Sequence, residues 1–314
     1  MADLRPRRVL RGGGVWIALM GAIAVGVLVA PGVVEPGHLP VVARRAAPLG
    51  LLALGQTILI LGRGFDLSVG GVVALVNVLA AGLFDGEGNA LAVAGICLGA
   101  GVAVGAANGA GIVYGRIPAL VMTLGMAFLL TGAVLAYTGG TPSGAVPEGI
   151  RALSSTRLTG IPLSVFIWAG LTVLLAIVLR GTWIGRHIYA RGVNPEAARL
   201  AGVRTQTVEF GSYVACGALA ATGGLLLAGF VGTGTLGAGQ DLMLGSLAAV
   251  VVGGTTFEGG RGGVVGSAAG AFLLTLVGAL LTGADVGKAG NLIAQGVVIL
   301  AAAALFRTHR DQGR

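Results

Sequence analysis

The sequence predicts an all-α polytopic membrane protein with about ten transmembrane helices, and three observations carry this prediction. Hydrophobic residues make up 55% of the 314 residues and charged residues only 10%, with a mean hydropathy of +0.92, whereas soluble domains carry about 25% charged residues. The apolar stretches reach roughly 20 residues, the length that crosses a bilayer. The 59 glycines suit membrane helices, because small residues let helix backbones approach closely in lipid.

Hydropathy divides the chain into ten apolar segments, which are the expected membrane helices. In order they cover residues 14–34, 46–62, 67–84, 90–114, 117–137, 162–180, 209–231, 240–254, 262–282 and 289–306. The second and eighth segments are short and could be discontinuous or re-entrant. We therefore expect a transmembrane domain at 14–306, between cytoplasmic tails at 1–13 and 307–314.

The first apolar segment follows four arginines, as the apolar part of a signal peptide would. It lacks a clear small-x-small cleavage site before Pro31 and is long enough to span a bilayer. We therefore expect it to remain in the protein as the first helix.

The basic residues predict the orientation of the chain in the membrane. With the N-terminus inside, 15 of the 20 lysines and arginines fall in inside segments, five of them at 180–208. This excess follows the positive-inside rule and predicts that both termini are cytoplasmic. The pair Arg44-Arg45 argues against the scheme, because it is placed outside.

Several kinds of site are disfavoured by the sequence. The net charge of +8 lies in loops without interleaved aromatic residues, which argues against nucleic-acid binding. The cysteines lie inside apolar runs and the histidines are scattered, so we expect no disulfide and no metal site. The motif Gly232-x-Gly234-x-x-Gly237 lacks the strand–turn–helix context of a dinucleotide site. The single lysine, Lys288, belongs to no P-loop, so we expect no cofactor, and any ATP hydrolysis must occur on another subunit.

A charged turn, Gly62-Arg-Gly-Phe-Asp-Leu-Ser-Val-Gly-Gly71, interrupts the apolar sequence. A charge flanked by membrane helices is costly, so Asp66 needs a reason to be there. One interpretation makes Asp66 a gate or a transport-path group. The other, which we favour, makes it a carboxylate that accepts backbone N–H groups at the start of the 67–84 helix, with Ser68 sharing the capping.

A second charged segment, residues 181–208, is predicted to hold a short cytoplasmic helix. Its characteristic residues are Asn194, Pro195, Glu196, Ala197, Ala198 and Gly202. The asparagine is a good N-cap, the proline suits the first turn, the glutamate complements the helix dipole, and the glycine suits a left-handed stop. The helix is either an ordinary solvated surface helix or a docking element. Its alanine-lined face favours docking into a groove of a partner.

Polar residues within the apolar segments are candidates for a solute path, namely Gln56, Asn77, Asn108, Thr123 and Gln295. Amides and hydroxyls can bond either a hydroxylated solute or a neighbouring helix, and for any single residue the second role is favoured. No charged pair lies deep in the segments, which argues against ion coupling and against a charged solute. A small neutral solute fits best.

Glycine spacing and a faint internal repeat indicate how helices pack. Glycines four residues apart form two runs typical of close helix packing, Gly101-Gly105-Gly109 and Gly262-Gly266-Gly270. In addition, Gly62-x-x-Phe65-Asp66 aligns with Gly254-x-x-Phe257-Glu258, and each is followed by Gly-Gly-Val-Val. This similarity is either chance or a pair of turns that reverse the chain between packed helices.

Three motifs together resemble the permease subunits of ribose-type ABC sugar importers. The first is Gly-x-Asp-Leu-Ser-x-Gly, formed by Gly64, Asp66, Leu67, Ser68 and Gly70. The second, Gly-x-Asn-x-x-Ala-Ala-x-x-x-Gly at 192–202, is similar to the coupling helix that sits on the ATPase of such importers. The third is Gly-Gly-Thr at 253–255 with Gly-Gly-Arg-Gly at 259–262. The resemblance covers about residues 46–306; Arg63 departs from it, since many relatives have a small residue there.

The resemblance implies the ABC importer permease fold and a subunit that translocates a small neutral solute, foremost a monosaccharide. It implies a cytoplasmic ATPase, an extracytoplasmic solute-binding protein and a second permease copy or homologue as partners, within membrane lipid. A permease for branched-chain amino acids or nucleosides would share the architecture, although the turn at 65–68 favours the sugar branch. A stand-alone secondary transporter is the alternative from another class, and a neighbouring ATPase gene would argue against it.

Overall fold

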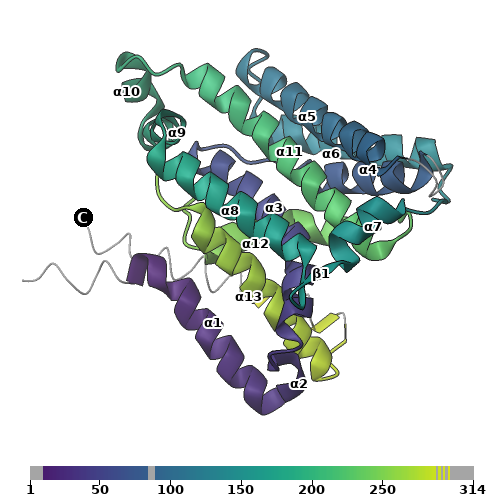
Figure 1. Cartoon of the computed structure of the whole chain (residues 1–314). Coiled ribbons are helices and arrows are strands. Elements are labelled where there is room, and N and C mark those ends of the chain that lie inside the picture. Colours follow the sequence, from purple (N-terminus) through teal and green to yellow (C-terminus); the bar gives the residue numbers. More distant parts are fainter. Residues whose placement is uncertain (1–9, 84–88, 288, 291–292, 294–295, 298–314) are drawn as a thin grey trace, which may run out of the picture.

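The computed structural model describes residues 10–83, 89–287, 289–290, 293 and 296–297, and most of these residues lie in helices (Figure 1). In order, the helices are α1 (Leu10–Val29), α2 (Pro31–Val34), α3 (Leu39–Leu61), α4 (Val69–Gly82), α5 (Ala90–Val113), α6 (Ala119–Thr138), α7 (Glu148–Ser155), α8 (Leu163–Gly181), α9 (Trp183–Val193), α10 (Pro195–Leu200), α11 (Thr205–Val231), α12 (Gln240–Val252) and α13 (Val264–Gly283). Two short antiparallel strands, β1 (Arg157–Leu158) and β2 (Ile161–Pro162), precede α8. The all-α prediction is confirmed for the described residues.

Membrane-spanning character is also confirmed by length and composition. Six of the described helices are long and apolar enough to cross a bilayer, namely α3, α5, α6, α8, α11 and α13. Three shorter apolar helices come from α1, α4 and α12. Most of the segment expected at 289–306, including Gln295, lies outside the described residues, so the count of about ten helices stays a prediction.

Helix α3 is longer than the sequence predicts. It begins at Leu39 and runs through Arg44, Arg45 and Pro48 to Leu61, so the expectation of a short second segment is wrong. The Arg44 guanidinium is accommodated because it donates to the Ser154 carbonyl at 3.4 Å and lies 4.7 Å from the centre of the Phe230 ring. Arginine and proline residues suggest a helix boundary in the hydropathy pattern, but α3 continues through them, and tertiary contacts stabilise the Arg44 side chain.

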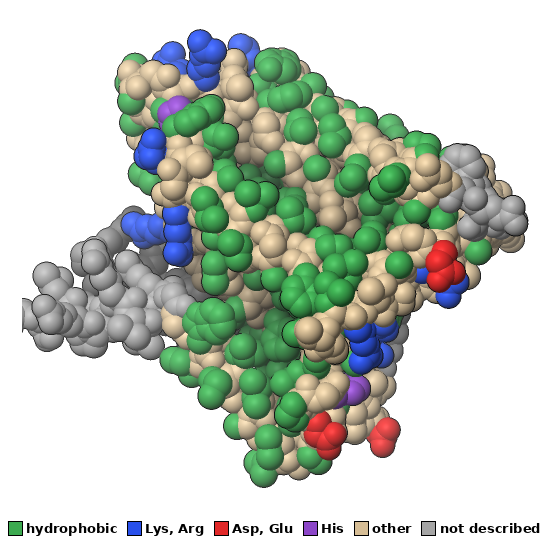
Figure 2. All heavy atoms as spheres, viewed as in Figure 1, with side chains coloured by type: hydrophobic (Ala, Val, Ile, Leu, Met, Phe, Trp, Pro, Cys, Tyr) green, Lys and Arg blue, Asp and Glu red, His purple; other side chains and the backbone are tan. Residues whose placement is uncertain are grey.

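Helices α3 and α11 form the centre of the molecule, and α5, α6 and α8 form its periphery (Figure 1). In their most apolar windows, α3 is 89% buried and α11 61% buried, whereas α6 and α8 are each only 17% buried. The outer helices therefore expose apolar side chains over much of the surface, as the space-filling view shows (Figure 2). Apolar faces of this extent suit contact with lipid or with other membrane helices.

Both glycine runs that were predicted to pack do so, with one exception. A Cβ on Gly105 of α5 would lie 2.4 Å from the Tyr213 carbonyl oxygen of α11, so the two backbones touch. A Cβ on Gly270 of α13 would lie 2.2 Å from the Ala249 carbonyl oxygen of α12. The exception is Gly262, which lies in the turn before α13.

Helix α12 is short, as expected of the eighth segment, and α4 is short as well. Their N-terminal ends touch, because a Cβ on Gly70 would lie 2.8 Å from the carbonyl oxygen of Gly239. An irregular stretch at 232–239 leads into α12, and it follows a helix rather than a strand, as expected for a chance dinucleotide motif. The elements α9 and α10 lie at one end of α11, and α7 lies toward the other (Figure 1).

Candidate functional site

The charged turn folds into a buried polar cluster between α3, α4 and α5. Asp66 is 1% exposed. Its Oδ1 accepts the backbone N–H of Ser68 at 2.7 Å and the Ser68 hydroxyl at 2.6 Å, and its Oδ2 accepts from Asn108 Nδ2 at 3.3 Å. No lysine or arginine forms an ion pair with Asp66 in the described part of the chain. Hydrogen-bond donors, rather than a cation, therefore stabilise this carboxylate.

The cluster matches the favoured interpretation of Asp66, with a correction for Ser68. The carboxylate accepts an N–H two residues ahead, immediately before α4 begins at Val69 rather than at 67. Ser68 occupies the N-cap position but makes no capping hydrogen bond, because its hydroxyl donates to Asp66 instead. The expectation that Ser68 shares the capping is therefore wrong.

Two of the candidate path residues belong to the same cluster. Gln56 of α3 donates to the backbone carbonyl of Asp66 at 2.5 Å and accepts the Asp66 N–H at 3.2 Å. Asn108 of α5 donates to the Ser68 hydroxyl at 2.9 Å, while its own Oδ1 has no protein partner. Tyr213 of α11 donates its hydroxyl to the Phe65 carbonyl at 3.2 Å. The turn is thus fixed by α3, α5 and α11 at once.

The other candidate path residues lie elsewhere. Asn77 of α4 accepts the backbone N–H of Thr235 at 2.7 Å and donates to the Thr233 carbonyl at 3.3 Å, so it fixes the stretch before α12. Thr123 donates to the Ala119 carbonyl of its own helix at 2.8 Å. The four described candidates are all fully buried and bonded to protein. In this conformation each connects or stabilises protein segments, whatever its role during transport.

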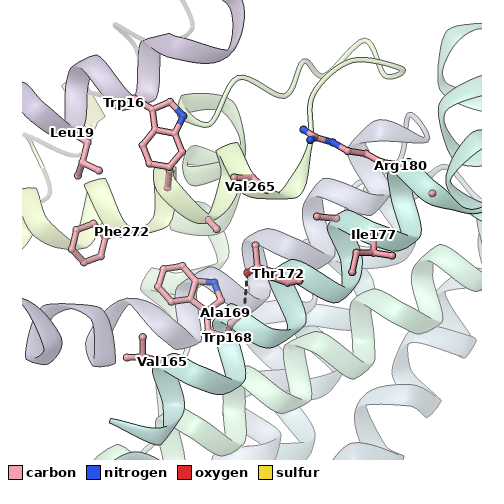
Figure 3. Close-up of a pocket in the computed structure, with 15 residues that line it drawn as sticks. Trp16, Leu19, Val165, Trp168, Ala169, Thr172, Ile177, Arg180, Val265 and Phe272 are labelled. Carbon is pink, nitrogen blue, oxygen red and sulfur yellow. Dashed lines mark hydrogen bonds between the residues drawn. The ribbon is translucent and has the colours of Figure 1, made fainter. Parts of the chain in front are cut away.

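A groove of about 800 Å³ lies between α1, α8 and α13 (Figure 3), and the four described candidates are not among the residues that line it. Its walls carry aromatic and aliphatic side chains such as Trp16, Trp168 and Phe272. The polar exceptions are Thr172, whose hydroxyl donates to the Trp168 carbonyl at 2.8 Å, and Arg180 at one end. Such walls suit hydrocarbon rather than a hydroxylated solute.

The predicted short helix is present as α10, with the expected ends. Asn194 accepts the backbone N–H groups of Glu196 and Ala197 at 3.0 and 3.1 Å, so it is the N-cap. Gly202 has a φ of +85°, and the Val203 N–H reaches the Ala198 carbonyl, which makes a left-handed stop.

The surface of α10 differs from the expected alanine-lined face. Ala198 is 5% exposed and faces the rest of the chain, so the expectation that it lies on a free docking face is wrong. Ala197 and Leu200 face outward, and Leu200 is 75% exposed. Glu196 forms an exposed ion pair with Arg199 at 2.5 Å, and this partner lowers the pKa of Glu196. The outward face is therefore mixed, with one large apolar side chain.

Sequence reasoning missed helix α9 and the contacts that attach it to the membrane helices. Arg191 of α9 forms an ion pair with Glu209 of α11 at 2.5 Å and donates to the Gly62 carbonyl. Tyr189 donates to the Gly262 carbonyl at 2.9 Å, and burial raises the pKa of its hydroxyl. The arginine was visible as part of a basic loop, but nothing in the sequence pairs it with a glutamate 18 residues away.

The two turns that the internal repeat aligned lie against each other. The Gly260 N–H donates to the Leu61 carbonyl at 2.8 Å. Both turns open with a left-handed residue, Arg63 with a φ of +66° and Gly254 with a φ of +88°. In each turn a backbone N–H closes the preceding helix by donating to a carbonyl five residues earlier, from Gly64 to Leu59 and from Thr255 to Val250. The two turns therefore end their helices in the same way. The structural correspondence pairs Arg63 with Gly254, one residue away from the sequence alignment, which pairs Gly62 with Gly254.

Comparisons with known proteins agree with this arrangement. Residues 40–303 match the family model described as the permease component of the branched-chain amino acid transport system. The chain is 33% identical over 293 residues to the ribose import permease protein RbsC of Escherichia coli K12, covering 91% of this chain and 90% of that protein. The Haemophilus influenzae ribose import permease is 31% identical over 294 residues, again with 91% and 90% covered.

A second kind of relative has nearly the same coverage. The autoinducer 2 import system permease protein LsrC of Shigella flexneri is 33% identical over 290 residues, covering 90% of this chain and 84% of that protein. No solved structure matches the chain. Since the family model and these relatives each extend over most of the sequence, the chain belongs to the ribose-type ABC importer permease family.

Proposed function

We propose that this chain is the membrane-spanning subunit of an ATP-driven importer and that its solute is a sugar or a similar small hydroxylated molecule. The observation that carries the proposal is the full-length similarity to import permeases whose names specify ribose and autoinducer 2. The apolar segments of the sequence carry no charged pair deep within them, which supports a neutral rather than a charged solute.

Each proposed partner contacts a different part of the molecule. A separate ATPase subunit docks on α10, where Leu200 and Ala197 face outward next to the Glu196–Arg199 ion pair. An extracytoplasmic binding protein delivers the solute at the opposite end, near α7. A second permease copy or a homologue pairs within the bilayer, for which the apolar faces of the outer helices offer surface.

The proposed orientation has the tails at 1–13 and 307–314 and the loop at 181–208 in the cytoplasm of a bacterium. The distribution of 15 of the 20 basic residues supports it. The transmembrane domain at 14–306 then holds about ten helices, the last of them at 289–306. The pair Arg44-Arg45 still argues against this orientation, although the contacts of Arg44 with Ser154 and Phe230 show how one of these charges is held at the end away from α10.

Within the permease, we assign the turn formed by Gly64, Asp66, Leu67, Ser68 and Gly70 a structural role that transport depends on. The hydrogen bonds from α3 and α5 to this turn support the assignment. Gln56, Asn77 and Asn108 remain candidates for contact with solute in a conformation where their protein partners separate.

One other solute class has a specific observation in its favour. The matching family model is described by branched-chain amino acid transport, so such an amino acid is the second candidate. A carboxylate and an ammonium group would need charged or strongly polar partners along the path. Competition between radiolabelled ribose and unlabelled leucine or a nucleoside would separate these classes.

The test is reconstitution with the ATPase and binding protein encoded next to the permease. We expect ATP-dependent uptake of ribose or a related sugar into proteoliposomes. Leu200→Arg should abolish co-purification of the ATPase and uptake, because it places a charge on an apolar contact without disturbing buried residues. Leu158→Arg, the same exchange on an exposed leucine in β1 at the opposite end of the molecule, is the matched control for docking and should leave co-purification of the ATPase unchanged. Uptake that continues without the ATPase would instead indicate a secondary transporter.

A further inference from the structure

Three segments meet beside the start of α10, and we call them the junction: residues 61–63, 191–193 and 258–260. The backbone is packed without room for side chains there. A Cβ on Gly192 would lie 1.8 Å from the Leu61 carbonyl oxygen and 2.4 Å from the Gly260 nitrogen. The junction therefore brings together the end of α3, the end of α9 and the turn between α12 and α13.

Arg63 connects all three segments of the junction with one side chain. Its Nε donates to the carbonyls of Gly192 at 2.7 Å and Glu258 at 3.0 Å, and its Nη2 donates to the Val193 carbonyl at 2.8 Å. Val193 immediately precedes Asn194, the N-cap of α10. The guanidinium thus fixes the base of α10 to the turns that precede α4 and α13.

Backbone geometry indicates that the side chain of Arg63 is there for these contacts. Its φ of +66° lies in the left-handed region, which favours glycine and costs about 1 kcal/mol or more for other residues. Glycine would suit the backbone of this turn better than arginine. The hydrogen bonds to three carbonyls offset that backbone cost.

We propose that Arg63 is a positioning residue that transmits movement of α10 to the short helices α4 and α12, an inference that rests on the proposed import function. If the ATPase displaces α10, the junction carries that displacement to the turns beside α3 and α13. Helix α4 begins after the first of these turns, and α12 ends before the second. The two helices also touch each other, where Gly70 of α4 meets Gly239 at the start of α12. A rigid contact of this kind is what a two-state switch requires.

Arg63→Gly is the informative variant, because it removes the guanidinium while favouring the left-handed backbone. In the complete complex it should insert, bind the ATPase and hydrolyse ATP, yet the sugar transported per ATP should fall about tenfold, the effect of losing one net charge-assisted hydrogen bond. Arg63→Lys should recover part of the loss. Arg186→Ala removes an exposed arginine from α9, outside the junction and the α10 face, and should leave the ratio unchanged.

A second measurement does not depend on transport. Spin labels at Leu200→Cys and Phe257→Cys, both exposed positions, report the distance between α10 and the turn before α13. The distance distribution should be narrow with Arg63 and at least twofold broader with Arg63→Gly. An unchanged distribution, an unchanged sugar-to-ATP ratio, or loss of ATPase binding by Arg63→Gly would each overturn the proposal. If the unmodified complex fails to transport sugar, the proposed function fails, and the spin-label result still decides the role of Arg63.

Discussion

The carboxylate of Asp66 illustrates how a membrane protein can bury an acidic residue without an ion pair. Three donors reach its two oxygens, two of them from Ser68 and one from Asn108. The Oδ1 of Asn108 has no protein partner, so the cluster is not fully satisfied in this conformation. An unpaired buried acceptor is unfavourable, and it gives this cluster one site where a different hydrogen bond could form.

This geometry predicts a graded response at position 66. Asp66→Asn keeps an oxygen for both Ser68 donors, and rotation of the Asn108 amide can meet the new NH₂ group, so we expect a loss of about 1 kcal/mol and partial transport. Asp66→Leu leaves all three donors without an acceptor and should cost roughly 3 kcal/mol or more, with transport lost. The measurements are thermal unfolding of the purified protein and sugar uptake.

The exchange of partners provides the control. Asp66→Asn combined with Asn108→Asp again sets a carboxylate opposite an amide, so it should be more stable than Asp66→Leu. An Asp66→Asn protein with unchanged unfolding but no transport would contradict the structural role and indicate that the negative charge itself acts in transport.

At the scale of the elements, close backbone contact decides which helices pair. A Cβ added to Gly105 of α5 would lie 2.4 Å from the Tyr213 carbonyl oxygen of α11. A Cβ added to Gly99 of the same helix would have no atom within 4 Å. Gly105→Ala should therefore lower stability by about 1–3 kcal/mol, the usual cost of overpacking. Gly99→Ala should leave stability equal or higher, because alanine favours helix.

The measurement is thermal unfolding of both variants in detergent under identical conditions. Equal unfolding temperatures for Gly99→Ala and Gly105→Ala would show that α5 and α11 are not held by this contact. The comparison is well matched, since both variants make the same chemical change in the same helix.

Most elements could be predicted from the sequence, because long apolar segments indicate membrane helices. The expected 90–114 and 162–180 segments correspond closely to α5 and α8. The start of α3 could not be predicted, since the partners of Arg44 come from residues more than 100 positions away. Helix α7 was missed because it is polar on one face and too short to give a hydropathy signal.

The candidate site was predictable in its local chemistry and not in its assembly. The cap at Asn194 and the stop at Gly202 depend on neighbouring residues alone, and both predictions are confirmed. The burial of Ala198 depends on how α10 rests on the chain, and the role of Arg63 depends on two segments far along the sequence. Local patterns determine helix ends, whereas packing determines which face remains free.

At the scale of the whole molecule, the arrangement predicts which loops can be reached from outside the cell. The basic loop with α10 should be cytoplasmic, and the β1–β2 ribbon should be extracytoplasmic. We expect Thr159→Cys to react with an impermeant thiol reagent in intact cells, because Thr159 is an exposed residue of that ribbon. Ser154 would be a poor reporter, since it is only 2% exposed and donates to the Leu226 carbonyl.

Ala201→Cys completes this test from the other side of the membrane. Ala201 is exposed directly after α10, so its cysteine should stay unlabelled in intact cells and react once the membrane is permeabilised, with the permease expressed without its ATPase. The native Cys97 and Cys216 are both fully buried, so the unmodified protein supplies a low background. Labelling of Ala201→Cys in intact cells would place α10 outside, where no cytoplasmic ATPase could reach it, and the proposed importer would lose its docking site.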